Sequence, residues 1–289
     1  MRIAPLLSNT LLSNAVSSST FLLVALSLGS FPATSAGRSD PGANHAAMAA
    51  SADAGHGTDA SRQIIASAIA NPARSDADRE RDGRDHPGEV LALAGFGPGM
   101  TIADVFGGGG YYSEILSSVV GAQGKILLVN NPPYEAFAKK DLAVRLADGR
   151  LPNVVSSVVP SDAMALGAST LDGALIVMSY HDLYYADPEQ GWPAIDAAQF
   201  IGQIATALKP GGTLLIIDHS ARDDSGKSAA QSLHRIDEAF AIADFKSHGL
   251  ALIGSSDVLR NKDDDRSLNV FDPAIRGKTD RFVHVYRKQ

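Results

Sequence analysis

Residues 98–116 read PGMTIADVFGGGGYYSEIL. An apolar, β-branched run at 101–107 leads into four consecutive glycines, and apolar residues at helical spacing follow. Glycine lets the backbone turn tightly and approach a ligand, and the first turn of a helix presents free N–H groups. The stretch therefore predicts a strand, a glycine loop and a helix. Such a loop is shared by nucleotide, flavin and methyl-donor sites, and it also occurs as a tight turn without a ligand.

The alternation of strand and helix continues to the end of the chain. Strands are predicted at 101–107, 125–131, 153–159, 173–179, 213–219, 251–259 and 281–288. Helices are predicted between them at 111–121, 135–149, 197–212 and 232–249. Continuous apolar strands separated by amphipathic helices indicate a mostly parallel sheet that is covered on both faces. We therefore expect an α/β fold with a Rossmann-like, doubly wound, seven-stranded sheet over residues 96–289.

The N-terminal part of the chain has a different texture. Residues 1–36 contain one charge, Arg2, then a short apolar run and the small residues ATSA, which is the order of a secretory signal. We predict cleavage after Ala36 and export, with the periplasm as the expected compartment and no stable membrane insertion. An uncleaved start is the alternative, because the segment before the apolar run is long and weakly basic. Residues 37–60 are predicted to form a disordered linker, and 61–95 a helical extension.

Composition narrows the range of functions. The formal charge is -7, so nucleic acid is not an expected partner. The chain has no cysteine, which removes disulfides, thiolate nucleophiles and cysteine-ligated zinc. The sequence makes no prediction of the oligomeric state.

Four blocks carry a resemblance to a known family. They are PGMTIADVFGGGGYYSEIL, VVPSDAMAL, GALIVMSYHDLYY and LKPGGTLLIIDHS, in this order and at agreeing spacing. The chain resembles the class I S-adenosylmethionine-dependent methyltransferases over roughly residues 61–289, and it looks most like their exported predicted-methyltransferase branch. The resemblance implies S-adenosylmethionine as the cofactor and a small molecule as the methyl acceptor.

The resemblance also places the first cofactor contacts. Asp104 takes the acidic position of the glycine motif, and Gly108 and Gly110 are the glycines that lie against the methionine part of the donor. Phe106 stands where most members have the first glycine, which is a departure from the family pattern. The expected cofactor-binding turn runs from Phe106 to Tyr111.

The ends of the next two strands are expected to meet the adenosine. Asn130 or Asn131 stands where an acidic side chain normally binds the ribose hydroxyls, and an amide supplies no negative charge there. By the same comparison Asp162 and Ala163 meet the adenine, although Asp162 is equally suited to cap a helix. The NPPY stretch at 131–134 matches a signature of amino methyltransferases, but that signature belongs after the fourth strand. We interpret it as a turn into the next helix.

The loop after the fourth strand, residues 179–185, is where an acceptor is expected. Ser179 is assigned to the cofactor site. His181 is the candidate catalytic base, with Asp182 fixing its orientation; the alternative is a loop histidine bonded to backbone. Tyr180, Tyr184 and His234 are candidate substrate contacts, and packing at the loop edges is an equally good interpretation of the tyrosines.

A metal site is not predicted. Three histidines, His181, His219 and His234, could together bind a metal ion, but no ligand spacing on one element supports such a site. Two other functions remain open. A protein that binds the donor or another small ligand without turnover is favoured by Phe106 and Asn130. A nicotinamide-dependent oxidoreductase is disfavoured, because the glycine block lacks the usual GxGxxG context.

Overall fold

The structure is a computed structural model, and it describes residues 58–289. The predicted signal segment and nearly all of the predicted linker lie outside the described residues. Three helices come first, α2 (Asp59–Ile69), α3 (Asp76–Asp85) and α4 (Pro87–Ala94). Each of α2 and α3 begins at a hydroxyl residue, Thr58 and Ser75, whose side chain accepts a backbone N–H of the first turn.

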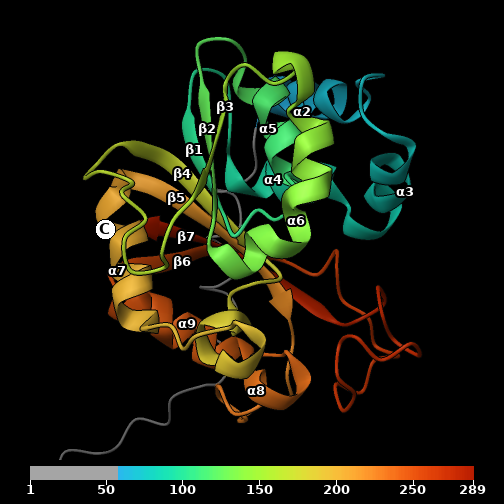
Figure 1. Ribbon diagram of the computed structural model, residues 1–289, viewed down its shortest axis with the longest axis vertical. Coiled ribbons are helices and arrows are strands. Elements are labelled where there is room, and N and C mark those ends of the chain that lie inside the picture. Colours follow the sequence, from blue (N-terminus) through green and yellow to red (C-terminus); the bar gives the residue numbers. More distant parts are fainter. Residues whose placement is uncertain (1–57) are drawn as a thin grey trace, which may run out of the picture. The chain divides into compact units, whose positions relative to one another are not determined.

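A seven-stranded sheet forms the centre of the fold (Figure 1), with the order β3-β2-β1-β4-β5-β7-β6. Its strands are β1 (Thr101–Val105), β2 (Lys125–Asn130), β3 (Val154–Val158), β4 (Leu171–Val177), β5 (Leu208–His219), β6 (Leu250–Ser256) and β7 (Arg281–Lys288). Only β7 runs antiparallel to its neighbours β5 and β6. The predicted doubly wound, mostly parallel sheet is confirmed.

Helices cover both faces of the sheet (Figure 1). The other helices are α5 (Tyr111–Val120), α6 (Pro132–Arg145), α7 (Ala197–Ala207), α8 (Ala230–Leu233) and α9 (Glu238–Ser247), with 3-10 turns η1 (Ala147–Gly149), η2 (His181–Tyr184) and η3 (Pro188–Gln190). Alternate residues of a strand pack into two hydrophobic cores, one on each face of the sheet. Ile102 of β1 packs in the cluster beneath α2, α4 and α5, whereas its neighbour Ala103 packs in the cluster beneath α7 and α9.

Two elements differ most from the prediction. The helix expected to run to residue 212 ends at Ala207, and LKPGG begins β5 instead, with Leu208 paired to Leu171. Lys209 precedes Pro210, and a residue before proline disfavours the helical conformation. The helix expected over 232–249 is split into α8 and α9, because His234 adopts a left-handed conformation with φ of 53° and ends α8.

The sheet order reverses between β1 and β4. In parallel α/β sheets a ligand binds outside the carboxyl ends of the strands at such a point. The glycine loop follows β1, and residues 178–185 follow β4. The fold thus brings together the two loops that the sequence singled out.

Packing of the sheet against Phe96 gives a test of this architecture. We expect Gly173→Ala to destabilise the protein by about 1–3 kcal/mol, because the added methyl group would overlap the buried Phe96 ring. Gly202→Ala in α7 is the control, since its methyl group would meet open space and alanine is the better helix former. Urea unfolding of both variants measures the difference, and equal stability of Gly173→Ala and the wild type would contradict this packing.

Candidate active site

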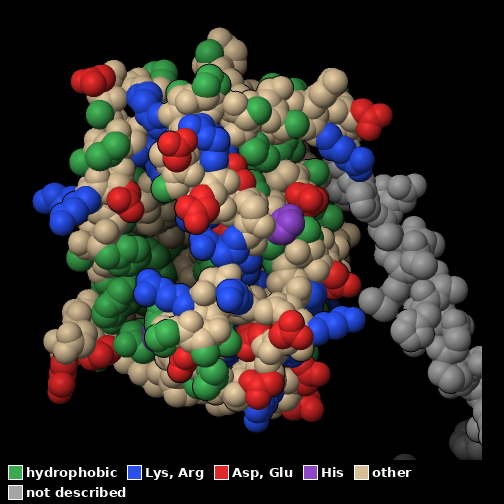
Figure 2. Space-filling view, turned by 90° about the vertical axis from the view of Figure 1, so that its right-hand side faces the viewer, with side chains coloured by type: hydrophobic (Ala, Val, Ile, Leu, Met, Phe, Trp, Pro, Cys, Tyr) green, Lys and Arg blue, Asp and Glu red, His purple; other side chains and the backbone are tan. Residues whose placement is uncertain are grey.

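A cavity of ≈ 730 Å³ opens at the carboxyl ends of β1 and β4. Small-molecule sites typically have volumes of about 300–1,000 Å³. Its walls come from α3, the glycine loop, α6, the loops after β4 and β5, and the segment 270–276. The face shown in Figure 2 includes a hollow beside gathered hydrophobic side chains, with acidic and basic side chains interspersed around it. The cavity lining includes Phe106, Gly107, Gly109, Tyr134, His181, Asp182, His219 and His234.

The glycine loop offers backbone donors to this cavity. Gly108 and Gly110 have positive φ values of 55° and 78°, which glycine adopts without strain. Within the described residues, no protein acceptor is found for the backbone N–H groups of Gly107 and Gly109. Both glycines line the cavity, just before the first turn of α5. The loop can therefore bind an anionic group of a ligand.

Asn130 supports the loop from behind. Gly108 N donates to Asn130 Oδ1, and Asn130 Nδ2 donates to Gly108 O, both at 3.0 Å. The side chain is buried, and it pairs with the peptide group because an amide offers one donor and one acceptor in matching positions. The structure thus gives Asn130 a loop-fixing contact, whereas the sequence suggested a contact with ribose.

Asp104 is also buried beneath the loop. Its carboxylate accepts a hydrogen bond of 2.7 Å from Ser113 Oγ of α5, and Gly107 lies so close that a side chain there would strike the carboxylate. Burial raises the pKa of Asp104 to about 6, against the lowering effect of the Ser113 hydrogen bonds. Asp104 therefore ties β1 to α5 and fixes the shape of the loop.

Aromatic rings fill the space at the first glycine position. Phe106 has φ of 55° and stacks on Tyr134, with ring centroids 4.5 Å apart and an interplanar angle of 12°. Tyr134 also lies edge-on to Trp192, at 5.6 Å between centroids. Tyr134 belongs to the NPPY stretch, in which Asn131 caps α6 by accepting the Tyr134 N–H at 3.0 Å. The predicted turn into a helix is present, and the sequence did not indicate that Tyr134 and Trp192 would line the cavity.

The expected adenine contacts lie elsewhere. Asp162 lines a neighbouring cavity of ≈ 500 Å³ together with Pro132 and Pro193, and it does not line the larger cavity. The Ala163 N–H donates to Pro160 O at 3.0 Å, so this donor is already used. The structure does not bring these two residues to the glycine loop.

His181 is held between two carboxylates. Its Nδ1 lies 2.7 Å from Asp218 Oδ1, its backbone N–H donates to Asp218 Oδ2 at 2.7 Å, and its Nε2 lies 3.2 Å from Asp182 Oδ1. Burial alone would lower the pKa of His181, but the charges of Asp218 and Asp182 outweigh it and raise the pKa to about 10. The same pairing holds the pKa of Asp182 well below its usual range despite burial. A protonated His181 cannot accept a proton at pH 7, which argues against the base role expected from the sequence.

His219 is the neutral histidine of the cavity. Burial, reinforced by the nearby positive charges of His181 and Arg281, lowers its pKa well below the usual value. Its Nδ1 lies 2.7 Å from Thr279 Oγ1, and its ring centroid is 5.8 Å from that of His181. His219 is therefore neutral near pH 7, and it is a weaker base than an ordinary histidine. The sequence indicated it only by its position at the end of a strand.

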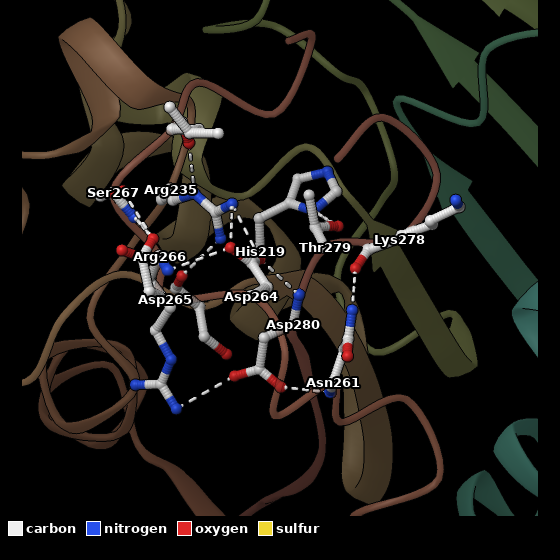
Figure 3. A network of polar contacts seen from close by, with 12 residues as sticks. His219, Arg235, Asn261, Asp264, Asp265, Arg266, Ser267, Lys278, Thr279 and Asp280 are labelled. Carbon is white, nitrogen blue, oxygen red and sulfur yellow. Dashed lines mark hydrogen bonds and ion pairs between the residues drawn. The ribbon is translucent and has the colours of Figure 1, made fainter. Parts of the chain in front are cut away.

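A polar network fixes the segment 261–280 beside His219 (Figure 3). The buried Arg235 donates to both carboxylate oxygens of Asp264, at 3.0 and 2.8 Å, and Asp264 in turn accepts the Asp280 N–H at 2.7 Å. Thr279, which contacts His219, lies next to Asp280 in this network. The segment carries Val270 and Phe271 to the cavity wall. The segment 261–280 is therefore a braced wall of the cavity.

The remaining predicted residues of the β4 loop point away from the cavity. Tyr180 and Tyr184 both donate to Asp244 Oδ2 of α9, at 2.6 and 2.5 Å, and neither lines the cavity. Both tyrosines thus pack at the edge of the loop, which was the alternative to a substrate contact. Ser179 is buried behind the loop, and its hydroxyl has no partner among the described residues.

His234 and Tyr111 do line the cavity. The His234 ring stands edge-on to His181 at 5.5 Å between centroids and packs against Tyr185 at 4.5 Å. The Tyr111 hydroxyl donates to Asp82 Oδ1 at 2.6 Å, and Arg81 lies over its ring. Both residues therefore lie at the cavity that the glycine loop and the loop after β4 share.

Solved structures with a similar architecture include methyltransferases. A methyltransferase dependent on S-adenosylmethionine from Aquifex aeolicus aligns over 75% of this chain and 100% of its own, with 19% identity and a TM-score of 0.50. A chain from the Haloferax volcanii complex that contains the Trm112 methyltransferase activator aligns over 78% of this chain and 96% of its own, with 17% identity and a TM-score of 0.52. The chain has the Rossmann-like methyltransferase fold.

At such identities the methyltransferase fold is what the comparison establishes. No protein-family model matches the sequence, and no curated protein matches it significantly. Among the described residues, none of the helices has the length and apolar character needed to cross a bilayer.

The buried Asp104 predicts a pH dependence of stability. Because its pKa is raised in the folded protein, the folded state binds more protons than the unfolded state between the usual pKa of 3.8 and about 6. The stability contributed by this group therefore falls as the pH rises through that window, by about 3 kcal/mol in total. Asp104→Asn should remove this dependence. Urea unfolding between pH 4 and 7 checks it, and a wild-type-minus-variant difference that is flat or rises with pH would contradict it.

Asn130 gives a second test. Asn130→Asp should destabilise the protein by about 1–3 kcal/mol, because a carboxylate cannot donate to Gly108 O and would be buried against it. Asn131→Asp is the matched control, since asparagine and aspartate cap helices equally well and the Ser161 hydroxyl can donate to the new carboxylate. Thermal unfolding measures both. Greater damage from the control than from Asn130→Asp would overturn the assigned contact.

Proposed function

We propose that this protein binds S-adenosylmethionine and transfers its methyl group to a small-molecule acceptor. One observation carries the proposal: the glycine loop, with its unpaired amides, and the polar loop after β4 line the same cavity at the point where the sheet order reverses. The amides of Gly107 and Gly109 suit the carboxylate of the donor's methionine part. The acceptor then lies toward His181 and His219.

The aromatic wall suits a sulfonium ion. Phe106, Tyr134, Phe137 and Trp192 form a connected set of rings, and aromatic faces attract a cation. The positive charge on sulfur falls as the methyl group leaves. An enclosed pocket that aligns donor and acceptor therefore provides most of the catalysis.

The two histidines have different roles in this proposal. His181, whose two ring nitrogens are paired with Asp218 and Asp182, holds the Asp182 carboxylate at the cavity wall. His219, which is neutral, takes up the proton that a hydroxyl or amine acceptor releases on methylation and passes it to solvent, because its lowered pKa makes it a weak base. Asp218 connects the two histidines, because it contacts the His181 ring and also accepts the His219 backbone N–H at 2.7 Å.

A second candidate is a protein that binds the donor or a related ligand without turnover. The stacking of Phe106 on Tyr134 favours it, because these rings fill the space beside the glycine loop. The occupied amide of Asn130 leaves the ribose without the side-chain partner that the family normally provides. Turnover separates this candidate from methyl transfer.

Calorimetry with S-adenosylmethionine, S-adenosylhomocysteine and NAD tests the proposal. We expect the two sulfur ligands to bind, and Gly109→Ala to weaken their binding about 10-fold or more, because its methyl group would strike Asp141 and shift the loop amides. Gly97→Ala is the control, since its methyl group meets open space.

The outcomes separate the functions. Binding of the donor with methyl release to an acceptor supports the transferase, and binding without release over a broad acceptor panel supports the binding protein. No binding of either sulfur ligand at millimolar concentration would remove both. Binding of NAD alone would favour an oxidoreductase.

A further inference from the structure

Three metal-ligating side chains converge on one wall of the cavity. Each of His181, Asp182 and His234 can offer one atom, and these atoms all lie within 4.8 Å of one another. The three residues come from η2 and from the end of α8, and all three line the cavity. Two imidazoles and one carboxylate form a donor set typical of divalent transition metals.

The spacing of the donor atoms suits such an ion. His181 Nε2 lies 3.2 Å from Asp182 Oδ1, and His234 Nδ1 lies 3.6 Å from the same oxygen. Ligands placed about 2.0–2.1 Å from a tetrahedral ion are separated from one another by about 3.3 Å. The separation of 3.6 Å between His234 Nδ1 and Asp182 Oδ1 is longer than a hydrogen bond, and it is that of a loose ion pair.

The outer atoms of two of these ligands are already held. His181 Nδ1 is paired with Asp218, which leaves Nε2 directed at Asp182. The second oxygen of Asp182 accepts the Tyr134 hydroxyl at 2.5 Å. Carboxylates and hydroxyls that orient metal ligands in this way are a regular feature of metal sites.

The His234 ring is held in place by its neighbours. The residue has a left-handed backbone, with φ of 53°, and it ends α8 after one turn. Tyr185 and Phe271 pack against the ring, whose Nδ1 lies 3.6 Å from Asp182 Oδ1.

The geometry points to a binding site for a divalent transition-metal ion, such as Zn²⁺ or Fe²⁺, with His181, Asp182 and His234 as its protein ligands. The remaining coordination positions face the cavity, where they are open to an oxygen or nitrogen atom of a small molecule. A metal-bound hydroxyl loses its proton more easily, so an acceptor held there would be a better nucleophile. Metal binding itself does not depend on the proposed methyl transfer.

The experiment uses purified full-length protein that has been treated with chelator and dialysed into phosphate-free buffer. Zn²⁺ is titrated calorimetrically without any methyl donor, and Co²⁺ is titrated in parallel as a spectroscopic probe. We expect one Zn²⁺ per chain at micromolar affinity or tighter, and Co²⁺ absorption bands of low-symmetry coordination. Asp218→Asn should weaken binding about 10–100-fold through loss of the partner that orients His181.

His234→Gln is expected to weaken Zn²⁺ binding at least about 100-fold, in line with removal of one of three protein ligands. His248→Gln is the matched control, because the His248 side chain is 17% exposed, close to the 16% of His234, and it contacts Asp244 rather than the cavity. The control should bind Zn²⁺ as the wild type does. Circular dichroism and thermal unfolding without metal establish that each variant is folded.

His234→Cys keeps the test decisive if the glutamine variant does not fold. A thiolate ligand at this position would add an intense sulfur-to-cobalt absorption band, which only direct coordination produces. Wild-type protein that binds neither Zn²⁺ nor Co²⁺ at 100-fold molar excess would overturn the site, as would His234→Gln that binds like the wild type. Either result would mean that Asp182 forms only an ion pair with His181. The proposed binding of the methyl donor is tested separately, by calorimetry with S-adenosylmethionine.

Discussion

A single buried carboxylate, Asp218, holds the site together. It is fully buried at the end of β5, and it accepts hydrogen bonds from the backbone N–H groups of His181 and His219 and pairs with the His181 ring. The loop after β4 is thereby locked to the end of β5. Because the carboxylate is removed from water, its charge acts strongly on His181, and the two histidines take opposite protonation states within one cavity. The proposed roles in proton transfer and metal binding both depend on this one side chain.

The architecture was largely readable from the sequence because its signals are local. Alternating apolar strands and amphipathic helices specify a parallel sheet, and glycines after the first strand mark the loop beside the ligand site. The prediction thus reached His181, Asp182, His234 and Tyr111, all of which line the cavity. Its boundary errors have local causes as well. Pro210 disfavours a helical conformation at Lys209, so α7 ends and β5 begins earlier than predicted. The left-handed His234 ends α8 although the apolar pattern continues beyond it.

The contacts that were missed depend on side-chain partners that no sequence spacing reveals. Asn130 stands at the position expected for ribose, yet its amide finds a matching peptide group at Gly108. Asp162 follows the expected strand, but it lines a neighbouring cavity and not the cavity at the glycine loop. The metal ligands come from two elements 50 residues or so apart in the chain, so the spacing rules that identify metal sites on one helix do not apply to them.

The position of β7 has a consequence for how this protein is assembled. β7 lies between β5 and β6 and pairs antiparallel with both, so β6 has no direct contact with the rest of the sheet except through it. The final strand in the chain is therefore an interior strand of the sheet. During synthesis, β6 emerges before the strand through which it joins the sheet, so its edge stays unpaired until β7 inserts between β5 and β6. Folding of this domain is completed from its C-terminal end.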